Sequence, residues 1–251
     1  MTDAGENLPG NVGGATRYGD RVHRPTGPWT PAVHALLRYL TPRLAHIPAV
    51  HGFDDAGREV VDFLPGHVID HDRQCLSDAQ LVSLVTWTAQ FHGAVAGFVH
   101  PGPWRYFPVA GATLIGHNDL APYNVCFDGD ELSGVFDWDL AGPSTPLAEL
   151  AFVAWNSAPL TRDLGTVETA RRLRLIAAAY SSRGSAVDAR ELLQAVPGRV
   201  QLMLDGIPAA AASGDAGMAN LVALGEPERS QVVLDALVSR LPLVYRLLDR
   251  P

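Results

Sequence analysis

Residues 116–139 constrain the fold more than any other part of the sequence, because they combine short apolar runs with turns in a fixed order. The apolar runs 125–127 and 135–136 lie on either side of an Asp-Gly-Asp turn at residues 128–130. Two such runs joined by a tight turn predict a β-hairpin. A polar turn precedes the hairpin, so we expect polar side chains to gather at the ends of its strands.

Three polar side chains of this segment are spaced so that they can meet. Asp119 and Asn124 are separated by a loop that contains a proline, and Asp137 directly follows the second apolar run. Two carboxylates and an amide suit phosphoryl transfer, in which one carboxylate receives a hydroxyl proton and the other groups hold Mg²⁺. Each residue alone would be an ordinary turn residue, because Asp and Asn favour turns. The ordered set of three predicts a catalytic site.

The same segment resembles the catalytic loop of the aminoglycoside phosphotransferase and choline kinase group, whose members are relatives of the protein kinases. The pattern of that group is His-Gly-Asp-Leu-x-x-x-Asn, followed by a hydrophobic residue, Asp, and Trp or Phe. Here it corresponds to residues 117–124 and 136–138. The resemblance implies that Asp119 is the catalytic base, that Asn124 and Asp137 are the metal ligands, and that His117 braces the loop.

A metal-dependent hydrolase is an alternative that would use His117, Asp119, Asp137 and Asp139 on a phosphoester without a nucleotide. The cluster contains a single histidine, which has no partner histidine at helical or short-loop spacing. Metal hydrolase motifs usually pair two histidines at such a spacing. The pattern therefore favours the phosphotransferase interpretation.

Composition excludes several classes of protein. The chain has 251 residues, of which 47% are hydrophobic, enough for a large core and one or two closely packed lobes. No apolar run approaches the roughly 18 residues that cross a bilayer, and the first residues lack the regions of a secretory signal. We therefore expect a cytoplasmic protein without a membrane partner. Cys75 and Cys126 have no zinc-site spacing and are predicted to be free, buried thiols.

The net charge of −8 bears on the partners of the protein. Nucleic acids are bound by basic surfaces, so a nucleic-acid partner is not expected. An acidic protein attracts cations instead, which is compatible with a cationic small-molecule acceptor.

The chain contains no lysine, so all 19 of its basic residues are arginine. A kinase-like fold normally holds phosphates with a strand lysine that is paired with a helix glutamate. The resemblance places Arg24 where that lysine is expected, and an arginine can grip phosphate as a bidentate fork. The helix after Arg24 contains no acidic residue up to Pro42. Either Arg24 binds phosphate alone, or nucleotide binding is weakened or lost.

The first 65 residues are predicted to form a small β-rich unit. Residues 13–24 predict a hairpin of two short strands, and the Gly13-Gly14 pair at its start could cover a nucleotide phosphate. Thr30 is expected to cap the following helix. Because so few residues precede this helix, we expect fewer than the five strands of the family's small lobe.

Residues 47–66 predict a second hairpin, with a tight turn near Gly57 and a break at Pro65. The resemblance identifies this break as the hinge between two lobes. It implies that backbone groups near Asp62, Phe63 and Leu64 face the adenine of a nucleotide.

The remainder of the chain is predicted to be mostly helical, because apolar residues recur at helical spacing after capping signals. Ser77 begins a long helix whose His92 lies on the apolar face, which is typical of a core histidine. Thr145 begins another helix, and the resemblance implies that Glu149 braces the catalytic loop. Further helices are expected at 166–182, 185–205 and 228–249, with an exposed arginine cluster at 171, 172 and 174 and a connection at 208–217.

Together these observations predict an α+β, protein-kinase-like fold of two lobes. Residues 1–65 would form a reduced nucleotide-binding lobe, and residues 66–251 a helical lobe that carries the catalytic loop and binds the acceptor. The expected activity is Mg²⁺-dependent transfer of the γ-phosphoryl group of ATP or GTP to a hydroxyl of a small molecule. The alternative is a catalytically weak or inactive pseudokinase-like binding protein, which the missing lysine and the short first lobe suggest.

Overall fold

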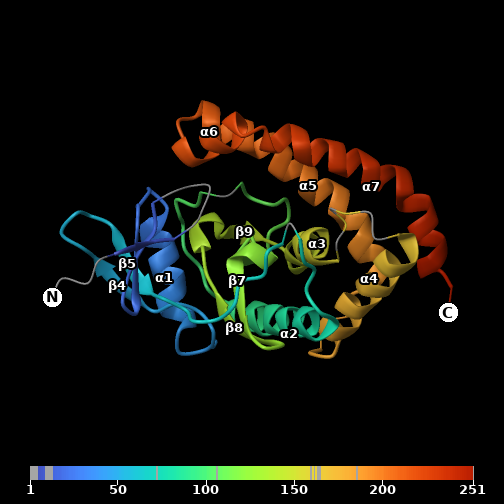
Figure 1. Cartoon of the computed structure of the whole chain (residues 1–251), viewed down its shortest axis with the longest axis horizontal. Coiled ribbons are helices and arrows are strands. Elements are labelled where there is room, and N and C mark those ends of the chain that lie inside the picture. Colours follow the sequence, from blue (N-terminus) through green and yellow to red (C-terminus); the bar gives the residue numbers. More distant parts are fainter. Residues whose placement is uncertain are drawn as a thin grey trace.

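The protein consists of an N-terminal lobe built on an antiparallel sheet and a mostly helical C-terminal lobe (Figure 1). The computed structural model describes residues 5–8, 14–71, 73–105, 107–158, 160, 162, 165–184 and 186–250. The predicted α+β class is therefore confirmed. The division at residue 65 stays a prediction; the last strand of the N-terminal sheet ends three residues earlier, at Asp62.

Among the described residues, the N-terminal sheet has five strands, in the order β1-β2-β3-β5-β4. The strands are β1 (Glu6–Asn7), β2 (Thr16–Tyr18), β3 (Arg21–Arg24), β4 (Val50–Phe53) and β5 (Glu59–Asp62). Both predicted hairpins are present, but the expectation of fewer than five strands was wrong. Each strand is two to four residues long, so a complete sheet fits into a short segment. Gly13 of the predicted glycine pair lies outside the described residues.

Helix α1 (Thr30–Leu40) packs a leucine-rich face into the core, as its spacing predicts. Its N-cap is Trp29, whereas the sequence predicted Thr30 for this position. The Thr30 hydroxyl instead accepts a hydrogen bond from the Gly27 N–H group at 2.9 Å. The threonine therefore stabilises the turn that precedes the helix. It lies one residue after the N-cap position, so it does not cap the helix.

The catalytic segment forms two small sheets. The predicted hairpin is confirmed as β7 (Val125–Asp128) and β8 (Glu131–Val135). The strand before the loop, β6 (Leu114–Gly116), pairs with β9 (Gly142–Ser144), which the sequence did not predict. A Gly-Pro-Ser strand has the composition of a turn, so tertiary pairing outweighs local propensity there. The polar loop is thus fixed at both of its ends.

Within the described part of the C-terminal lobe, six α-helices surround the catalytic segment. They are α2 (Asp78–Val95), α3 (Pro146–Ser157), α4 (Thr166–Ser181), α5 (Ala189–Ala212), α6 (Ala216–Ala223) and α7 (Glu226–Leu248). Ser77 caps α2 with the predicted capping box, and Thr145 caps α3. Helices α5 and α7 lie side by side and arch over the catalytic segment (Figure 1).

Helix α5 continues through Pro208, where we had expected a connection. A proline inside a helix removes one backbone hydrogen bond, but residues 209–212 are all alanine, which has the highest helix propensity. The preceding Gly206 also packs closely against the Phe107 ring. Local propensity and packing together compensate for the missing bond. The start expected for this helix, Ser185, lies outside the described residues.

Two residues of the predicted exposed arginine cluster of α4, Arg171 and Arg174, are exposed, whereas Arg172 is buried. The three side chains also join α4 to other helices. Arg171 and Arg172 both contact Asp78 at the start of α2, and Arg172 also donates to the carbonyl groups of Leu76 and Ser157. Arg174 donates to carbonyl groups at the end of α7. These contacts satisfy backbone groups at helix ends, where carbonyls otherwise lack partners.

Both cysteines are free thiols, as predicted, but only Cys126 is buried; Cys75 is exposed. In the described part of the chain, no helix is both long and apolar enough to cross a membrane.

His92 lies in the core, as predicted, with its Nδ1 atom 2.8 Å from the Tyr180 hydroxyl oxygen. Burial lowers the pKa of His92 to about 3, below its usual value of about 6.5 in an unfolded chain. The unfolded state therefore binds a proton more readily, and stability is lost as the pH falls below about 6.5.

We expect the wild type to lose about 2 kcal/mol more unfolding free energy between pH 7.5 and pH 5.0 than His92→Gln does. Urea unfolding of both proteins at the two pH values measures this difference. Equal losses would show that His92 does not contribute to the pH dependence.

Candidate active site

Two buried side chains, those of Glu149 and His117, hold the loop between β6 and β7 in place. Glu149 of α3 accepts hydrogen bonds from the backbone N–H groups of His117 and Asn118, both at 2.8 Å. His117 accepts at Nδ1 from the Asp119 N–H group at 3.2 Å and lies with Nε2 3.0 Å from the Phe136 carbonyl oxygen. Both residues therefore brace the loop, as the sequence resemblance implied.

The packing under the loop leaves no room for a larger residue at Gly116. A Cβ atom there would lie 2.6 Å from Cδ of Glu149.

Burial raises the pKa of Glu149 to about 7, against the opposing effects of Arg199 and the two N–H donors. The Arg199 guanidinium also donates to the Asn118 carbonyl at 2.7 Å, which fixes the same turn from α5. Asn118 needs this support because its φ of 63° is unfavourable for a residue other than glycine.

The structure brings Asp119, Asn124 and Asp137 together. The Asn124 amide nitrogen donates to Asp119 Oδ2 at 2.7 Å and to the Asp119 carbonyl at 3.0 Å. The Phe136 N–H group donates to the Asn124 backbone carbonyl at 3.0 Å, and Asp137 is the next residue in the chain. Burial raises the pKa of Asp119 to about 7, and the negative charge of Asp137 adds to this effect. Convergence of the three predicted side chains is thus observed.

Arg24 reaches this cluster from the N-terminal lobe. Its Nη2 atom lies 2.7 Å from Asp137 Oδ1 and 3.2 Å from Asp139 Oδ1. Burial alone would raise the pKa of Asp137, but the Arg24 charge holds this pKa below its usual value. Asp137 also has a φ of 58°, an uncommon conformation that turns its side chain after β8. The predicted phosphate residue and a predicted metal ligand therefore meet across the two lobes.

Two oxygen atoms of the cluster are available to a cation. Among the residues that the structure describes, no donor contacts Asn124 Oδ1 or Asp137 Oδ2. Amide and carboxylate oxygens are hard ligands of the kind that Mg²⁺ prefers. A protein usually supplies only one or two ligands to Mg²⁺. The donor set therefore fits a magnesium ion that completes its coordination with phosphate and water.

The other two predicted binding residues lie at the hinge. The Asp62 carboxylate is occupied, because it accepts from Arg21, His51 and the Ala49 N–H group at 2.7 to 3.0 Å. The Asp62 N–H group also has a partner, the Ala49 carbonyl at 3.1 Å. The role of the hinge backbone in binding a nucleotide stays a prediction. The Leu64 N–H group has no acceptor within the described ranges of the chain.

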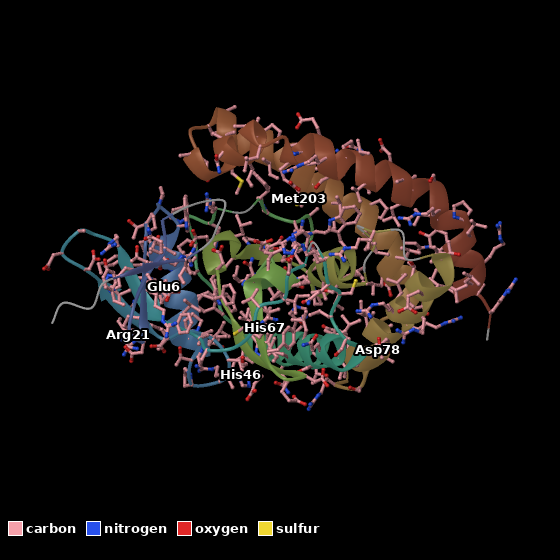
Figure 2. All side chains as sticks on the ribbon, in the orientation of Figure 1. Glu6, Arg21, His46, His67, Asp78 and Met203 are labelled. Carbon is pink, nitrogen blue, oxygen red and sulfur yellow. The ribbon has the colours of Figure 1, made fainter. Side chains whose placement is uncertain are left out.

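The hinge runs along the hairpin that carries the cluster. The Cys126 thiol of β7 lies 3.8 Å from the Leu64 carbonyl, and His67 exchanges two backbone hydrogen bonds with Phe127. In Figure 2, His67 lies between the N-terminal lobe, which carries Arg21, and Asp78 at the start of α2. Leu64 is therefore next to the catalytic hairpin. Among the contacts of the described residues, none joins Asp62 or Leu64 to Asp119.

Two residues of the site were missed by the sequence analysis. The Tyr123 hydroxyl donates to Asp119 Oδ1 at 2.9 Å. Arg105 forms a bidentate contact of 2.8 Å with Asp215 at the start of α6 and lies 3.3 Å from Asp139. Tyr123 lies inside the motif, so its position could have indicated a role in the site. Arg105 lies in a loop without periodicity, and no sequence pattern indicates a role for it.

The hydrolase alternative does not match the geometry. Both ring nitrogens of His117 already have backbone partners, and burial lowers its pKa to about 4. Within the described ranges, no group of three or more His, Cys, Asp or Glu side chains is placed to hold a metal ion. A centre built from His117 and three aspartates is therefore not formed.

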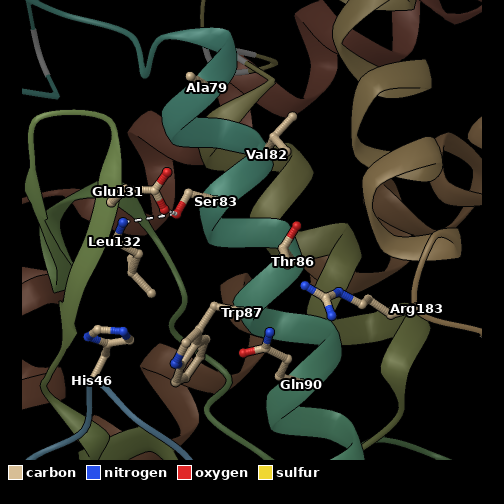
Figure 3. A pocket seen from close by; sticks show the side chains of 10 residues that line it. All are labelled: His46, Ala79, Val82, Ser83, Thr86, Trp87, Gln90, Glu131, Leu132 and Arg183. Atoms are coloured by element: carbon tan, nitrogen blue, oxygen red, sulfur yellow. Dashed lines mark hydrogen bonds between the residues drawn. The ribbon is translucent and has the colours of Figure 1, made fainter.

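A separate cavity of about 420 Å³ lies between α2 and β8. Figure 3 shows Ser83 of α2 in this cavity, where its hydroxyl accepts a hydrogen bond from the Leu132 N–H group at 2.9 Å. The polar residues around it include Gln90, Glu131 and Arg183. None of the predicted site residues lines this cavity, so it is distinct from the candidate active site.

Several solved structures share the fold, of which three are described. An amicoumacin kinase in complex with AMP-PNP, Ca²⁺ and Ami superposes with a TM-score of 0.63 at 13% identity, over 92% of this chain and 88% of that one. The aminoglycoside phosphotransferase APH(3'')-Id from Streptomyces rimosus, with ADP and streptomycin, gives 0.56 at 15%, over 78% and 91%. A microcompartment-associated aminopropanol kinase gives 0.54 at 16%, over 88% and 90%. These similarities confirm the predicted kinase-like fold.

The sequence itself has two informative matches. Residues 103–191 match the model of the phosphotransferase enzyme family, and this range contains the whole catalytic loop. A trifolitoxin immunity protein of Rhizobium leguminosarum bv. trifolii is 33% identical over 194 residues, which are 69% of this chain and 74% of that protein. The predicted resemblance is thereby confirmed: this chain belongs to the phosphotransferase enzyme family.

Proposed function

We propose that this protein transfers the γ-phosphoryl group of ATP or GTP to a hydroxyl group of a small molecule. The convergence of Asp119, Asn124 and Asp137 in one cluster, with Arg24 opposite, is the observation that supports the proposal most strongly. Phosphoryl transfer needs a positioned base, metal ligands and a positive charge near the phosphates. The cluster contains candidates for each of these parts.

Asp119 is the proposed catalytic base. Its Oδ2 atom is held by Asn124 and its Oδ1 atom by Tyr123, so the carboxylate has one fixed orientation. Its pKa of about 7 lies close to neutral pH, where a general base combines a useful deprotonated fraction with proton affinity. The acceptor hydroxyl would donate to Oδ1, where it shares or replaces the Tyr123 bond.

Asn124 Oδ1 and Asp137 Oδ2 are the proposed metal-binding atoms. Mg²⁺, when bound, neutralises charge on the phosphate tail. The remaining contacts of both residues keep these oxygens in place, because Asn124 is tied to Asp119 and Asp137 to Arg24. The Arg24 guanidinium would pair with phosphate oxygens from the opposite lobe, as arginine does well.

The hinge is the proposed adenine or guanine site. The Leu64 N–H group would donate to the base and the Asp62 carbonyl would accept from it. The Asp62 carboxylate stays with Arg21 and His51, and this contact would hold the hinge backbone in position. An enzyme that consumes ATP or GTP in this way would work in the cytoplasm.

The proposed acceptor is a hydroxylated amine, because four carboxylates, those of Asp119, Asp137, Asp139 and Asp215, gather around the site. Proteins similar to this chain suggest further acceptors. They include a trifolitoxin immunity protein, an amicoumacin kinase, an aminoglycoside phosphotransferase in complex with streptomycin, and an aminopropanol kinase. Antibiotics, toxins and amino alcohols are therefore the first acceptors to test.

A transfer assay tests the proposal. Wild-type protein, Mg²⁺ and γ-labelled ATP or GTP are incubated with a panel of such acceptors, and labelled products are separated from free phosphate. We expect label on at least one acceptor and none with the Asp119→Ala variant. Nucleotide binding without transfer to any acceptor would favour the pseudokinase-like alternative, and release of phosphate from a phosphoester without nucleotide would favour a hydrolase.

A further inference from the structure

Arg24 has a third acidic neighbour besides Asp137 and Asp139, and this residue has no proposed role as a base or a metal ligand. Glu59 of β5 is the register partner of Arg24 on β3, and its Oε1 atom lies 3.7 Å from Arg24 Nε. Glu59 is only 3% exposed. A carboxylate this deeply buried needs partners, because an unpaired buried charge is strongly unfavourable. Its other oxygen accordingly lies 2.9 Å from Nε2 of His34.

His34 connects this carboxylate to helix α1. The imidazole is 2% exposed and lies with its ring centroid 5.1 Å from that of Phe53 on β4. Contacts on both sides therefore fix its position. The result is a continuous chain of contacts from α1 through His34 and Glu59 to Arg24.

We propose that Glu59, held by His34, is a positioning residue that aims Arg24 at the phosphates of the nucleotide. The inference rests on the proposed function of the site. Helix α1 has no acidic residue of its own, so the carboxylate that orients the phosphate-binding cation comes from strand β5. The helix contributes a histidine that supports this carboxylate.

The directions of the contacts support this role. Glu59 faces the Nε edge of the guanidinium, whereas Nη2 faces Asp137 and Asp139. A guanidinium has five donors in a rigid plane, so an acid at Nε fixes the plane and leaves the Nη donors for an anion. A metal ion on Asp137 would weaken the pair between Asp137 and Arg24. Glu59 would then be the contact that still holds Arg24 in place.

The test compares ligands with and without phosphates. Dissociation constants of Mg²⁺-ATP and of adenosine are measured by calorimetry for the wild type and for Glu59→Gln, which keeps the shape of the side chain. We expect Mg²⁺-ATP to bind about tenfold more weakly to the variant, because Arg24 would lose the ion pair that orients it. Adenosine affinity should stay within about twofold, because adenosine does not reach Arg24.

His23→Gln is the matched control. His23 also lies on β3 and pairs with a carboxylate, with Nδ1 2.8 Å from Asp54 Oδ2, but it points to the opposite face of the sheet from Arg24. The control should change neither dissociation constant. His34→Gln should weaken Mg²⁺-ATP in the same sense as Glu59→Gln, and it replaces that variant if Glu59→Gln does not fold.

A double-mutant cycle with Arg24→Gln separates positioning from a general structural role. If Glu59 acts through Arg24, Glu59→Gln should cause no further loss of Mg²⁺-ATP affinity once Arg24 is absent. Equal losses for ATP and adenosine, or unchanged ATP affinity in Glu59→Gln, would overturn this inference alone. If the wild type bound Mg²⁺-ATP no more tightly than adenosine, both this inference and the proposed role of Arg24 would be overturned.

Discussion

Replacement of Asp119 by asparagine is expected to lower kcat by about 10²–10⁴-fold, the range contributed by a positioned general base. The nucleotide dissociation constant should change little, because Asp119 faces the acceptor side of the cluster in our proposal. Asparagine keeps the size of the side chain and can still bond to Asn124 and Tyr123, which now contact the carboxylate. Steady-state kinetics and nucleotide titration of the same preparation measure both effects.

Asp128→Asn is the matched control for this experiment. Asp128 lies at the exposed end of the same hairpin and carries none of the proposed roles. Its kcat should equal that of the wild type. An Asp119→Asn variant with full turnover but poor nucleotide binding would contradict the assignment of Asp119 as the base.

Replacement of Asp137 by asparagine is expected to reduce activity by at least about 10²-fold at a Mg²⁺ concentration that saturates the wild type, since even supporting residues of metal sites contribute 10–100-fold. The variant should regain part of its activity as Mg²⁺ is raised. Loss of the charge also releases Arg24, whose Nη2 atom lies 2.7 Å from Asp137. Activity measured over a series of Mg²⁺ concentrations tests this expectation, again with Asp128→Asn as the control.

A different result would separate the two roles of Asp137. An unchanged Mg²⁺ dependence, with a lower kcat at every concentration, would indicate that Asp137 serves only to hold Arg24. The proposed metal site would then be wrong.

The catalytic segment could be predicted from the sequence because its information is local. The hairpin, the turn at residues 128–130 and the order of Asp119, Asn124 and Asp137 all lie within 24 consecutive residues. Short-range patterns of this kind determine turns and strand ends directly. The same holds for the capping signals of α2 and α3, which the structure confirms.

The partners of the cluster could not be predicted, because they come from distant parts of the chain. Arg24 and Asp137 are 113 residues apart in sequence, and Arg105 and Asp215 are 110 apart. The contact between Glu59 and His34 likewise depends on the packing of a helix against a sheet. No local pattern contains such information. The resemblance indicated Arg24 as a phosphate-binding residue, but it did not indicate the contact of Arg24 with Asp137, and it gave no role to Arg105 or His34.

Errors in the fold arose where tertiary structure outweighs local propensity. Strand β1 has only two residues, too few to show a period of two, whereas the other four strands lie in the predicted hairpins. Strand β9 has a turn-like composition, and the Ala- and Gly-rich segment 208–217 suggested a connection where α5 continues to Ala212. In each case hydrogen bonding or packing to a remote segment determines the local conformation.

Stabilisation by nucleotide and metal is the most direct test of the central claim, which is that Asn124 and Asp137 hold Mg²⁺ against a nucleotide beside Asp119. Unfolding of the wild type and of Asp137→Asn is measured with ATP or GTP alone, with Mg²⁺ alone and with both. We expect both together to stabilise the wild type by about 2.7 kcal/mol at 100 times the dissociation constant, and Asp137→Asn by much less. No stabilisation by any nucleotide with Mg²⁺, or the same stabilisation in both proteins, would contradict the claim.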